Sequence, residues 1–209
     1  MFDAAIDNPT RRRVLGITVP ALSAAGFLWW RRNIGTPAVL PGSATADIVS
    51  IVEFSDTGEK LGVAPLPKIV RPDQDWWNRL TPQQYYVTRS HSTDTPFTGT
   101  YYLLHQPGLY HCICCATALF DSATKYDSGS GWPSFWAPIA AENVRTVDTP
   151  GLSGKTALDS GIEVLCKRCD AHLGHIFGDG PEPTNLRYCI NESALRFVPR
   201  ATIKAQRTP

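Results

Sequence analysis

Four of the six cysteines have the spacing of metal ligands. Cys112 and Cys115 form one Cys-x-x-Cys pair, and Cys166 and Cys169 form a second. Each pair can present two thiolates from a tight turn, and four thiolates satisfy the tetrahedral coordination of Zn²⁺. The spacing therefore predicts a closed, structural zinc site. Structural disulfides, favoured in an oxidising compartment, and a redox-active pair are the alternatives, although the βαβ pattern of a thioredoxin-like motif is absent.

Cys189 stands outside those four ligands and is the candidate nucleophile. It lies in a predicted strand over 187–190, two residues after Arg187 and two before Asn191. The two-residue period of a strand places these three side chains on one face. A cation within reach favours the thiolate, which is the nucleophilic form, so Arg187 is expected to activate Cys189.

His172, His175 and Asp179 are the candidate proton donors and their partner. Two histidines three residues apart can supply protons, and an aspartate can orient them. Each of these residues, taken singly, is more often an ordinary surface or core residue. Grouped with a spare cysteine, they indicate a site where a thiolate attacks an electrophilic centre and an imidazolium protonates the departing oxygen.

An aromatic run over 131–136, Gly-Trp-Pro-Ser-Phe-Trp, could form the apolar wall of such a site. The indole of Trp132 is large, rigid and apolar, which suits contact with a small methyl group. A cluster of this kind is also common in protein cores, and composition alone does not separate the two interpretations.

Several motifs, in order along the chain, resemble those of the methionine-R-sulfoxide reductase B family. The similarity runs from about Trp77 to Pro199 and rests on the two Cys-x-x-Cys pairs and three further motifs: Gly131-Trp-Pro-Ser-Phe135, His172-Leu-Gly-His-Ile-Phe-Gly-Asp-Gly-Pro181 and Arg187-Tyr-Cys-Ile-Asn191. The resemblance implies a mainly β domain, with two antiparallel sheets and a few short helices at its edge. It also implies thiol-dependent reduction of methionine-R-sulfoxide, peptide-bound or free.

The resemblance assigns a role to each candidate residue. Cys189 resembles the family's catalytic thiol, which attacks sulfur, releases methionine and is left as a sulfenic acid. Trp132 resembles the residue that contacts the substrate methyl group, and Phe177 part of the same apolar wall. The polar groups around the sulfoxide oxygen correspond to His172, His175 and Asn191, and the charged residues that tune the thiol correspond to Asp179 and Arg187.

Two positions depart from the family pattern. Many members carry a recycling cysteine just before Gly-Trp-Pro, where this chain has Ser130. Cys114 is then the remaining thiol, and it could resolve the sulfenic acid, substitute as a zinc ligand, or do neither. Direct reduction of Cys189 by an external, thioredoxin-like thiol is the favoured expectation. Asn185 replaces a glycine before Leu-Arg-Tyr-Cys, and Asn tolerates a positive φ better than most residues, so the turn is expected to survive.

The N-terminus resembles an export signal. Three arginines at 11–13 precede a largely apolar stretch from Val14 to Trp30, as in a bacterial twin-arginine signal. Seventeen helical residues would span roughly 25 Å, which is short for a bilayer core of about 30 Å. The segment is expected to be either a cleaved signal or a membrane anchor, in the periplasm or on the outer face of the inner membrane.

The rest of the chain is expected to be mainly β. Predicted strands cover 48–54, 100–104, 108–112, 162–166, 187–190 and 195–198, and Thr81 with Pro82 predicts the start of a short helix. The expected organisation is a signal or anchor at 1–46, a linker or extension at 47–75, a reductase domain at 76–200 and a tail at 201–209.

Charge and motif content also weigh against other functions. The net charge is +1, with 20 basic and 19 acidic residues, so a nucleic-acid partner is not indicated. A non-catalytic zinc-ribbon-like module would leave Cys189 and the histidines without a purpose, and a thiol peroxidase is the second rival. The Gly-Cys-Phe-Trp motif of S-epimer reductases is missing, which favours the R epimer.

Overall fold

The computed structural model describes residues 47–147, 158 and 161–200. The chain divides into two units, 1–44 and 45–209, and the described residues all belong to the second. The predicted signal or anchor at 1–46 and the tail at 201–209 lie outside the described residues. Among the helices that are described, none has the length and apolar character needed to cross a membrane.

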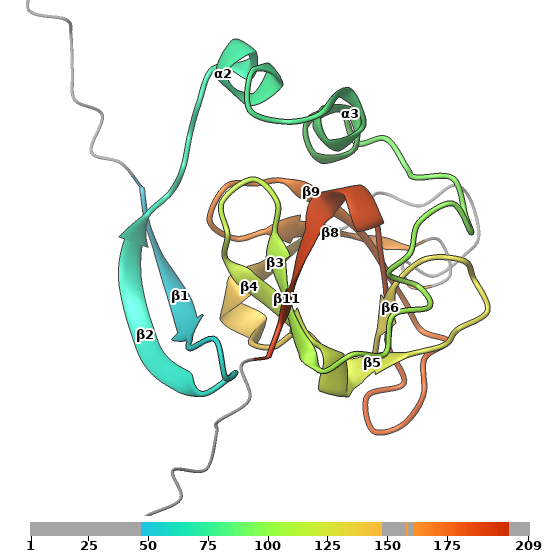
Figure 1. Ribbon diagram of the computed structural model, residues 1–209. Coiled ribbons are helices and arrows are strands. Elements are labelled where there is room, and N and C mark those ends of the chain that lie inside the picture. The colour runs from blue at the N-terminus through green and yellow to red at the C-terminus, as the bar shows by residue number, and fades with distance from the viewer. Residues whose placement is uncertain (1–46, 148–157, 159–160, 201–209) are drawn as a thin grey trace, which may run out of the picture. The chain divides into compact units, whose positions relative to one another are not determined.

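The larger of two sheets in the main domain has six antiparallel strands (Figure 1). Strand β10 lies between β6 and β9, so the segment that carries Cys189 is paired along both edges. In spatial order the strands are β5 (Lys125–Tyr126), β6 (Ser134–Phe135), β10 (Arg187–Ile190), β9 (His172–Phe177), β8 (Ile162–Cys166) and β7 (Val144–Val147).

The second sheet has three antiparallel strands, in the order β11 (Leu195–Pro199), β3 (Gly108–Cys112) and β4 (Ala118–Asp121). Aromatic rings join it to the larger sheet. Phe120 on β4 stacks on Phe135 of β6 with ring centroids 4.5 Å apart, and Tyr110 on β3 meets the same Phe135 edge-on at 5.0 Å. All three side chains are fully buried, so their apolar area contributes strongly to the core.

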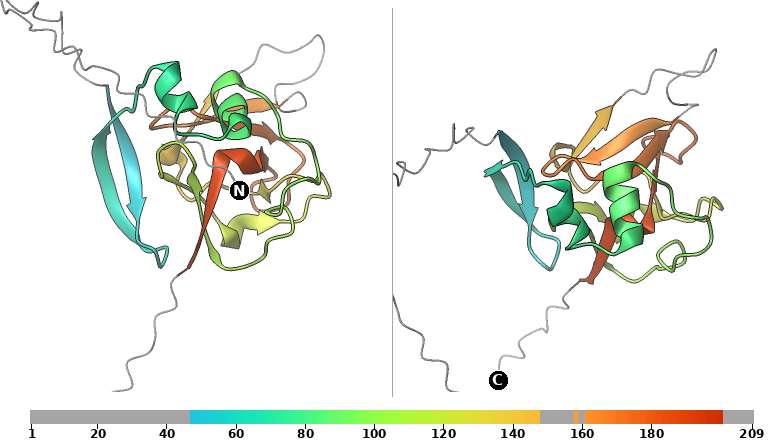
Figure 2. Two further views of the ribbon diagram at one scale, coloured as in Figure 1. Left: turned by 45° about the horizontal axis from the view of Figure 1, so that its top comes forward. Right: turned by 90° about the horizontal axis from the view of Figure 1, so that it is seen from above.

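Two short helices, α2 (Asp73–Trp77) and α3 (Pro82–Ser90), lie together at one end of the sheets (Figure 2). The prediction that a helix starts at Thr81 and Pro82 is confirmed. The Thr81 hydroxyl accepts a hydrogen bond from the Gln84 backbone, and the Gln84 side chain accepts one from the Thr81 backbone, which is a complete capping box. Three single 3-10 turns complete the regular structure: η1 (Ser122–Thr124), η2 (Ala141–Asn143) and η3 (Glu192–Ala194).

The segment expected to be a linker or extension at 47–75 contains a β-hairpin. The predicted strand β1 (Ile48–Phe54) is confirmed, but residues Lys60–Pro67 form a second strand, β2, that pairs with it. The fully buried Asn143 fastens this hairpin to the domain: it accepts a hydrogen bond from the Val52 N–H and donates to the carbonyls of Val52 and Ala118. Prolines and glycines in this segment masked its strand character in the sequence.

The predicted strand at 100–104 is also wrong. The side-chain carboxylate of Glu192 accepts hydrogen bonds from the backbone N–H groups of Thr100 and Tyr101, and the chain turns there. A distant carboxylate thus takes the donors that a neighbouring strand would have used. The remaining predicted strands, β3, β8, β10 and β11, are confirmed, as is the mainly β class with antiparallel sheets. Two of these sheets lie within residues 76–200, and the β1–β2 hairpin is a third.

Candidate functional site

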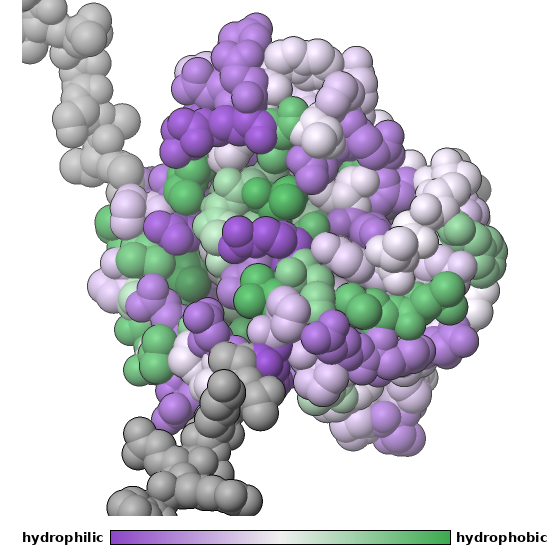
Figure 3. Space-filling view, viewed as in Figure 1, coloured by the Kyte–Doolittle hydropathy of each residue, from purple (hydrophilic) through white to green (hydrophobic). Residues whose placement is uncertain are grey.

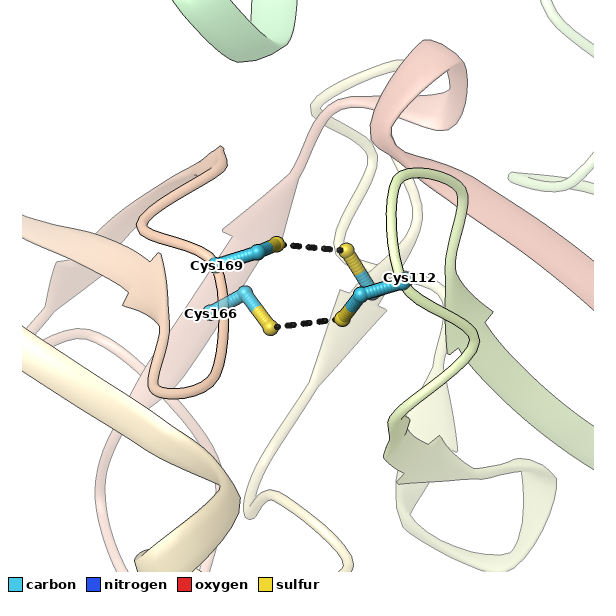
Figure 4. A group of neighbouring side chains, drawn as sticks. Cys112, Cys166 and Cys169 are labelled. Carbon is cyan, nitrogen blue, oxygen red and sulfur yellow. Dashed lines mark hydrogen bonds between the residues drawn. The ribbon is translucent and has the colours of Figure 1, made fainter. Parts of the chain in front are cut away.

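The two Cys-x-x-Cys pairs form matching turns that face one another (Figure 4). Cys112 ends β3 and Cys166 ends β8, and in each turn the first cysteine's carbonyl accepts an N–H from the residue four positions later, at 2.9 Å in both cases. Those later residues, Ala116 and Asp170, have positive φ values of 60° and 52°, which turn the chain back directly after the second cysteine of each pair.

The four sulfurs fit a zinc ion. Sγ of Cys112 lies 3.7 Å from Sγ of Cys169, and Sγ of Cys115 lies 3.5 Å from Sγ of Cys166. A regular tetrahedron with Zn–S bonds of about 2.3 Å places sulfurs about 3.8 Å apart, whereas a disulfide needs about 2.05 Å. The geometry therefore matches structural zinc and excludes the disulfide alternative. Cys114 lies in the same turn but outside this set, with its thiol 3.4 Å from the Thr88 hydroxyl.

A separate cavity of about 350 Å³ contains Cys189. Its lining brings together five of the predicted site residues besides the thiol itself. The lining consists of Thr93, Ser130, Trp132, Gly174, His175, Phe177, Arg187, Cys189 and Asn191. Arg187 and Cys189 on β10 thus line one cavity together with Asn191, which lies just beyond the end of that strand.

The strand register places His175 beside Cys189. Cys189 on β10 is the direct partner of His175 on β9 and of Ser134 on β6. Directly opposed residues in an antiparallel pair have Cβ atoms roughly 5 Å apart and point to the same side of the sheet. The imidazole is therefore positioned to exchange a proton with the thiol or with a ligand bound against it.

Burial determines the charge states of the Cys189 thiol and the His175 imidazole. It raises the pKa of the Cys189 thiol, while the positive charge of Arg187 and a contact with Ser130 oppose the rise. Burial also lowers the pKa of His175. The resting state at neutral pH is consequently a thiol beside a neutral imidazole, rather than the free thiolate that the sequence led us to expect.

Arg187 is held by two neighbours. Its Nε and Nη2 donate to the two carboxylate oxygens of Asp179 at 2.8 and 2.9 Å, and its guanidinium carbon lies 4.3 Å from the centre of the Phe177 ring. Asp179 does not line the cavity and its side chain is 63% exposed. Asp179 therefore contacts the cavity through Arg187, the other charged residue that the resemblance assigns to tuning the thiol.

His172 also lies away from the cavity. Its side chain is 1% exposed, and its Nδ1 is 2.7 Å from Oε1 of Glu163. Its ring centre is 5.3 Å from that of His175. The structure thus brings His175 to the thiol but places His172 behind it, where it can support but does not touch a ligand in the cavity.

Asp94 is a residue that the sequence analysis missed. Its backbone carbonyl accepts the indole N–H of Trp132 at 2.9 Å, and its backbone N–H donates to Oδ1 of Asn191 at 2.9 Å. Its buried carboxylate accepts from Gln83 and from both the backbone and the hydroxyl of Ser193. One residue thereby fixes both an aromatic and a polar group of the cavity, through backbone atoms that no sequence motif reveals.

Ser130 occupies the position next to the thiol. Its Oγ lies 3.9 Å from Sγ of Cys189. Asn185, the other departure noted in the sequence, has a φ of 58°, which confirms that the turn survives in the left-handed conformation.

Comparisons with known proteins agree on one family. A family model described as the SelR domain matches residues 80–199. The Peptide methionine sulfoxide reductase MsrB of Pseudomonas aeruginosa strain UCBPP-PA14 is 51% identical over 137 residues, which cover 65% of this chain and 98% of the relative. The MsrB of Hahella chejuensis is 49% identical over 133 residues, covering 63% and 91% respectively.

A plant relative shows similar identity over a shorter share of its length. The Peptide methionine sulfoxide reductase B1, chloroplastic, of Oryza sativa subsp. japonica is 51% identical over 131 residues, covering 60% of this chain and 56% of that protein. The β1–β2 hairpin, at 48–67, precedes the residues that the family model matches.

The zinc site leads to a stability prediction. Replacing the buried Cys166 by Ser should abolish stoichiometric zinc and lower the free energy of unfolding by about 4 kcal/mol or more, since loss of a structural metal is among the largest single-residue effects. Metal analysis and denaturant unfolding of the two proteins measure this.

Cys114→Ser is the matched control, because it removes a thiol from the same turn but outside the four sulfurs. It should keep one zinc per chain and near-normal stability. Equal zinc loss in both variants would contradict the assignment of ligands.

Proposed function

The chain belongs to the methionine-R-sulfoxide reductase B family and reduces methionine-R-sulfoxide with thiols as the reductant, and we propose that Cys189 is the nucleophile. The observation that carries this proposal is the cavity in which Cys189 lies opposite His175 and beside Trp132. The other described cysteines all lie in the two zinc turns. Cys189 is the one thiol with an imidazole partner across the sheet.

His175 serves as a proton shuttle in this mechanism. The neutral imidazole takes the proton of the Cys189 thiol as sulfur attacks the sulfoxide sulfur, and passes it to the sulfoxide oxygen. The step balances without an external proton: Cys–SH and the sulfoxide give Cys–SOH and the thioether. Arg187 favours the transient thiolate, and Asp179 keeps the guanidinium in place.

Trp132 and Phe177 supply the apolar wall for the methyl group of the substrate. Both line the same cavity as the thiol. The Trp132 indole N–H is occupied by the Asp94 carbonyl, which leaves the face of the ring to the ligand. Asn191 lines the cavity and uses Nδ2 to donate to the Leu173 carbonyl at 3.2 Å. An amide nitrogen carries two protons, so one remains for the sulfoxide oxygen.

We propose that an external, thioredoxin-like thiol regenerates Cys189. Ser130, the side chain in contact with the sulfur, cannot form a disulfide. One external thiol attacks the sulfenic acid, forming a mixed disulfide and releasing water; a second thiol displaces Cys189 and leaves the donor oxidised. Both steps need an accessible sulfur, and the cavity is open enough for Cys189 to be half-buried.

We also propose that the chain is exported by the twin-arginine route to the periplasm and can stay tethered to the membrane. The arginines at 11–13 and the apolar stretch at 14–30 support this. On the hairpin, Ile48, Leu61 and Val63 are 63%, 64% and 57% exposed, and apolar residues gather there in Figure 3. Such a surface would suit a position near lipid.

The export proposal is tested by fractionation of cells that express the full chain. It predicts reductase in the periplasmic or membrane fraction, and retention in the cytoplasm when Arg12 and Arg13 are replaced by Lys. A cytoplasmic wild-type protein would refute it.

The reaction itself predicts a strict dependence on Cys189. With dithiothreitol and a peptide carrying either epimer, the protein should reduce the R form only. Cys189→Ser should lower kcat by about a thousandfold or more, since removal of a nucleophile leaves only the binding and electrostatic part of catalysis. Cys114→Ser is the control and should keep near-normal turnover; activity that survives in Cys189→Ser would overturn the assignment.

The contacts of Asp94 lead to a second prediction, which concerns the positions of Trp132 and Asn191 in the cavity. Asp94→Ala removes the hydrogen bonds of the carboxylate to Gln83 and Ser193, which loosens the backbone that contacts Trp132 and Asn191. The value of kcat/KM should therefore fall by about 10- to 100-fold, chiefly through KM, because small misplacements of binding groups are costly. The neighbouring exposed residue provides the control: Thr95→Ala should change neither constant by more than about twofold. Unchanged kinetics in Asp94→Ala would show that the segment is held by other contacts.

A further inference from the structure

A row of polar side chains crosses the six-stranded sheet. Tyr126 on β5 pairs with Ser134 on β6, Ser134 with Cys189 on β10, and Cys189 with His175 on β9. The row then continues to β8, where the direct partner of His175 is Glu163. The order along this part of the row is therefore thiol, imidazole, carboxylate, on neighbouring strands and on one side of the sheet.

The Glu163 carboxylate lies between two further histidines. Its Oε1 is 2.6 Å from Nδ1 of His91 and 2.7 Å from Nδ1 of His172. Burial raises the pKa of this carboxyl, but the two histidine contacts lower it below its usual range, so Glu163 is ionised at neutral pH. Its side chain is 15% exposed, while those of His91 and His172 are 58% and 1% exposed.

These contacts set the tautomer of His172. An ionised carboxylate only accepts hydrogen bonds, so the proton of neutral His172 lies on Nδ1. Nε2 is then an unprotonated acceptor, and it is buried without a partner among the described residues. A metal ion bound by His91, Glu163 and His172 would instead require Nδ1 as ligand and force the proton onto Nε2. In the structure Nδ1 is already committed to the Glu163 carboxylate, so a metal ion at this cluster would have to displace that hydrogen bond.

We propose that Glu163 is a positioning residue of this reductase: it holds His172 behind His175 and provides the negative charge that lets His175 become protonated beside Cys189. The proposal deepens the function assigned to the cavity and rests on it. Without the carboxylate, the buried His172 and the half-buried His175 would lie together with no negative charge to offset the cost of placing a proton on either. With it, the imidazole can take the thiol proton and pass it on.

The charges around His175 come from every neighbouring element. Glu163 on β8 favours protonation of His175, whereas burial and the charge of His91, at the end of α3, oppose it. From β10, Cys189 and Arg187 line the same cavity, and Arg187 is paired with Asp179. His172 lies on the same strand, and Tyr126 at the far end of the row. Of these, Glu163 is the group that raises the pKa of His175.

Glu163→Gln is the direct test, because the amide oxygen can still accept from His172 while the charge is removed. In the zinc-loaded full-length protein, NMR titration should show the pKa of His175 moved down by about one pH unit, as expected for one charge a few ångströms away in a partly screened site. The acid limb of kcat/KM should move down with it. The plateau of kcat/KM above this limb should fall about tenfold. The fraction of protein with a Cys189 thiolate and a protonated His175 falls tenfold for each unit by which the pKa of His175 decreases.

Two further variants separate charge from structure. Glu163→Asp keeps the carboxylate and should restore the pKa of His175. His91→Ala removes an opposing charge from an exposed site, so it should move the pKa and the acid limb upward by a few tenths of a unit, a small effect because solvent screens it.

A uniform loss of activity in Glu163→Gln, with the pKa of His175 unmoved, would reduce Glu163 to a structural role and overturn the proposal. If Glu163→Gln fails to fold, the NMR titration of His91→Ala is the deciding test. A His175 pKa that does not move, or that moves down, in His91→Ala would refute the proposal. The NMR titration needs no substrate, so a failure of the reductase assignment would leave this result readable in its own right.

Discussion

The close approach of β9 and β10 is the constraint on which the site depends. It is possible because Gly174 lies on β9 with a φ of 152°, and a Cβ at that position would collide with the backbone carbonyl of Cys189. A slip of one residue in this pairing would turn the side chains of β9 to the opposite face and separate His175 from the thiol. The register of these two strands is therefore part of the chemistry as well as of the fold.

The zinc site stabilises the adjoining pair of strands, β8 and β9. Cys166 ends β8 and Cys169 lies in the turn that leads into β9, so the metal ties the turn between these strands to the turn after β3. Glu163 and His175 lie on the two strands so joined, and the register between them is irregular just beyond, at Val164 and Leu165. Zinc, being redox-inert, can brace this arrangement without competing with the working thiol.

What the sequence could predict follows from the kind of interaction involved. The zinc ligands, Cys189 and its neighbours on β10 are marked by side-chain type and short spacing, so the sequence alone predicts them. Glu163 and Asp94 could not be found, because they act through a cross-strand partner and through backbone atoms whose positions only the fold sets. For the same reason the two histidines of one motif, alike in sequence, take different places: His175 in the cavity and His172 behind it.

The most direct test of the account is a single turnover without added reductant. Zinc-loaded protein is mixed with excess peptide methionine-R-sulfoxide, the methionine formed is counted, and sulfenic acid is trapped with dimedone and located by peptide mass spectrometry. The account predicts about one methionine per chain, with the adduct on Cys189 alone and no disulfide to Cys114. Methionine formed with the oxidation on another cysteine, or none formed by folded protein, would contradict the assignment of Cys189 as the thiol that the sheet positions for attack.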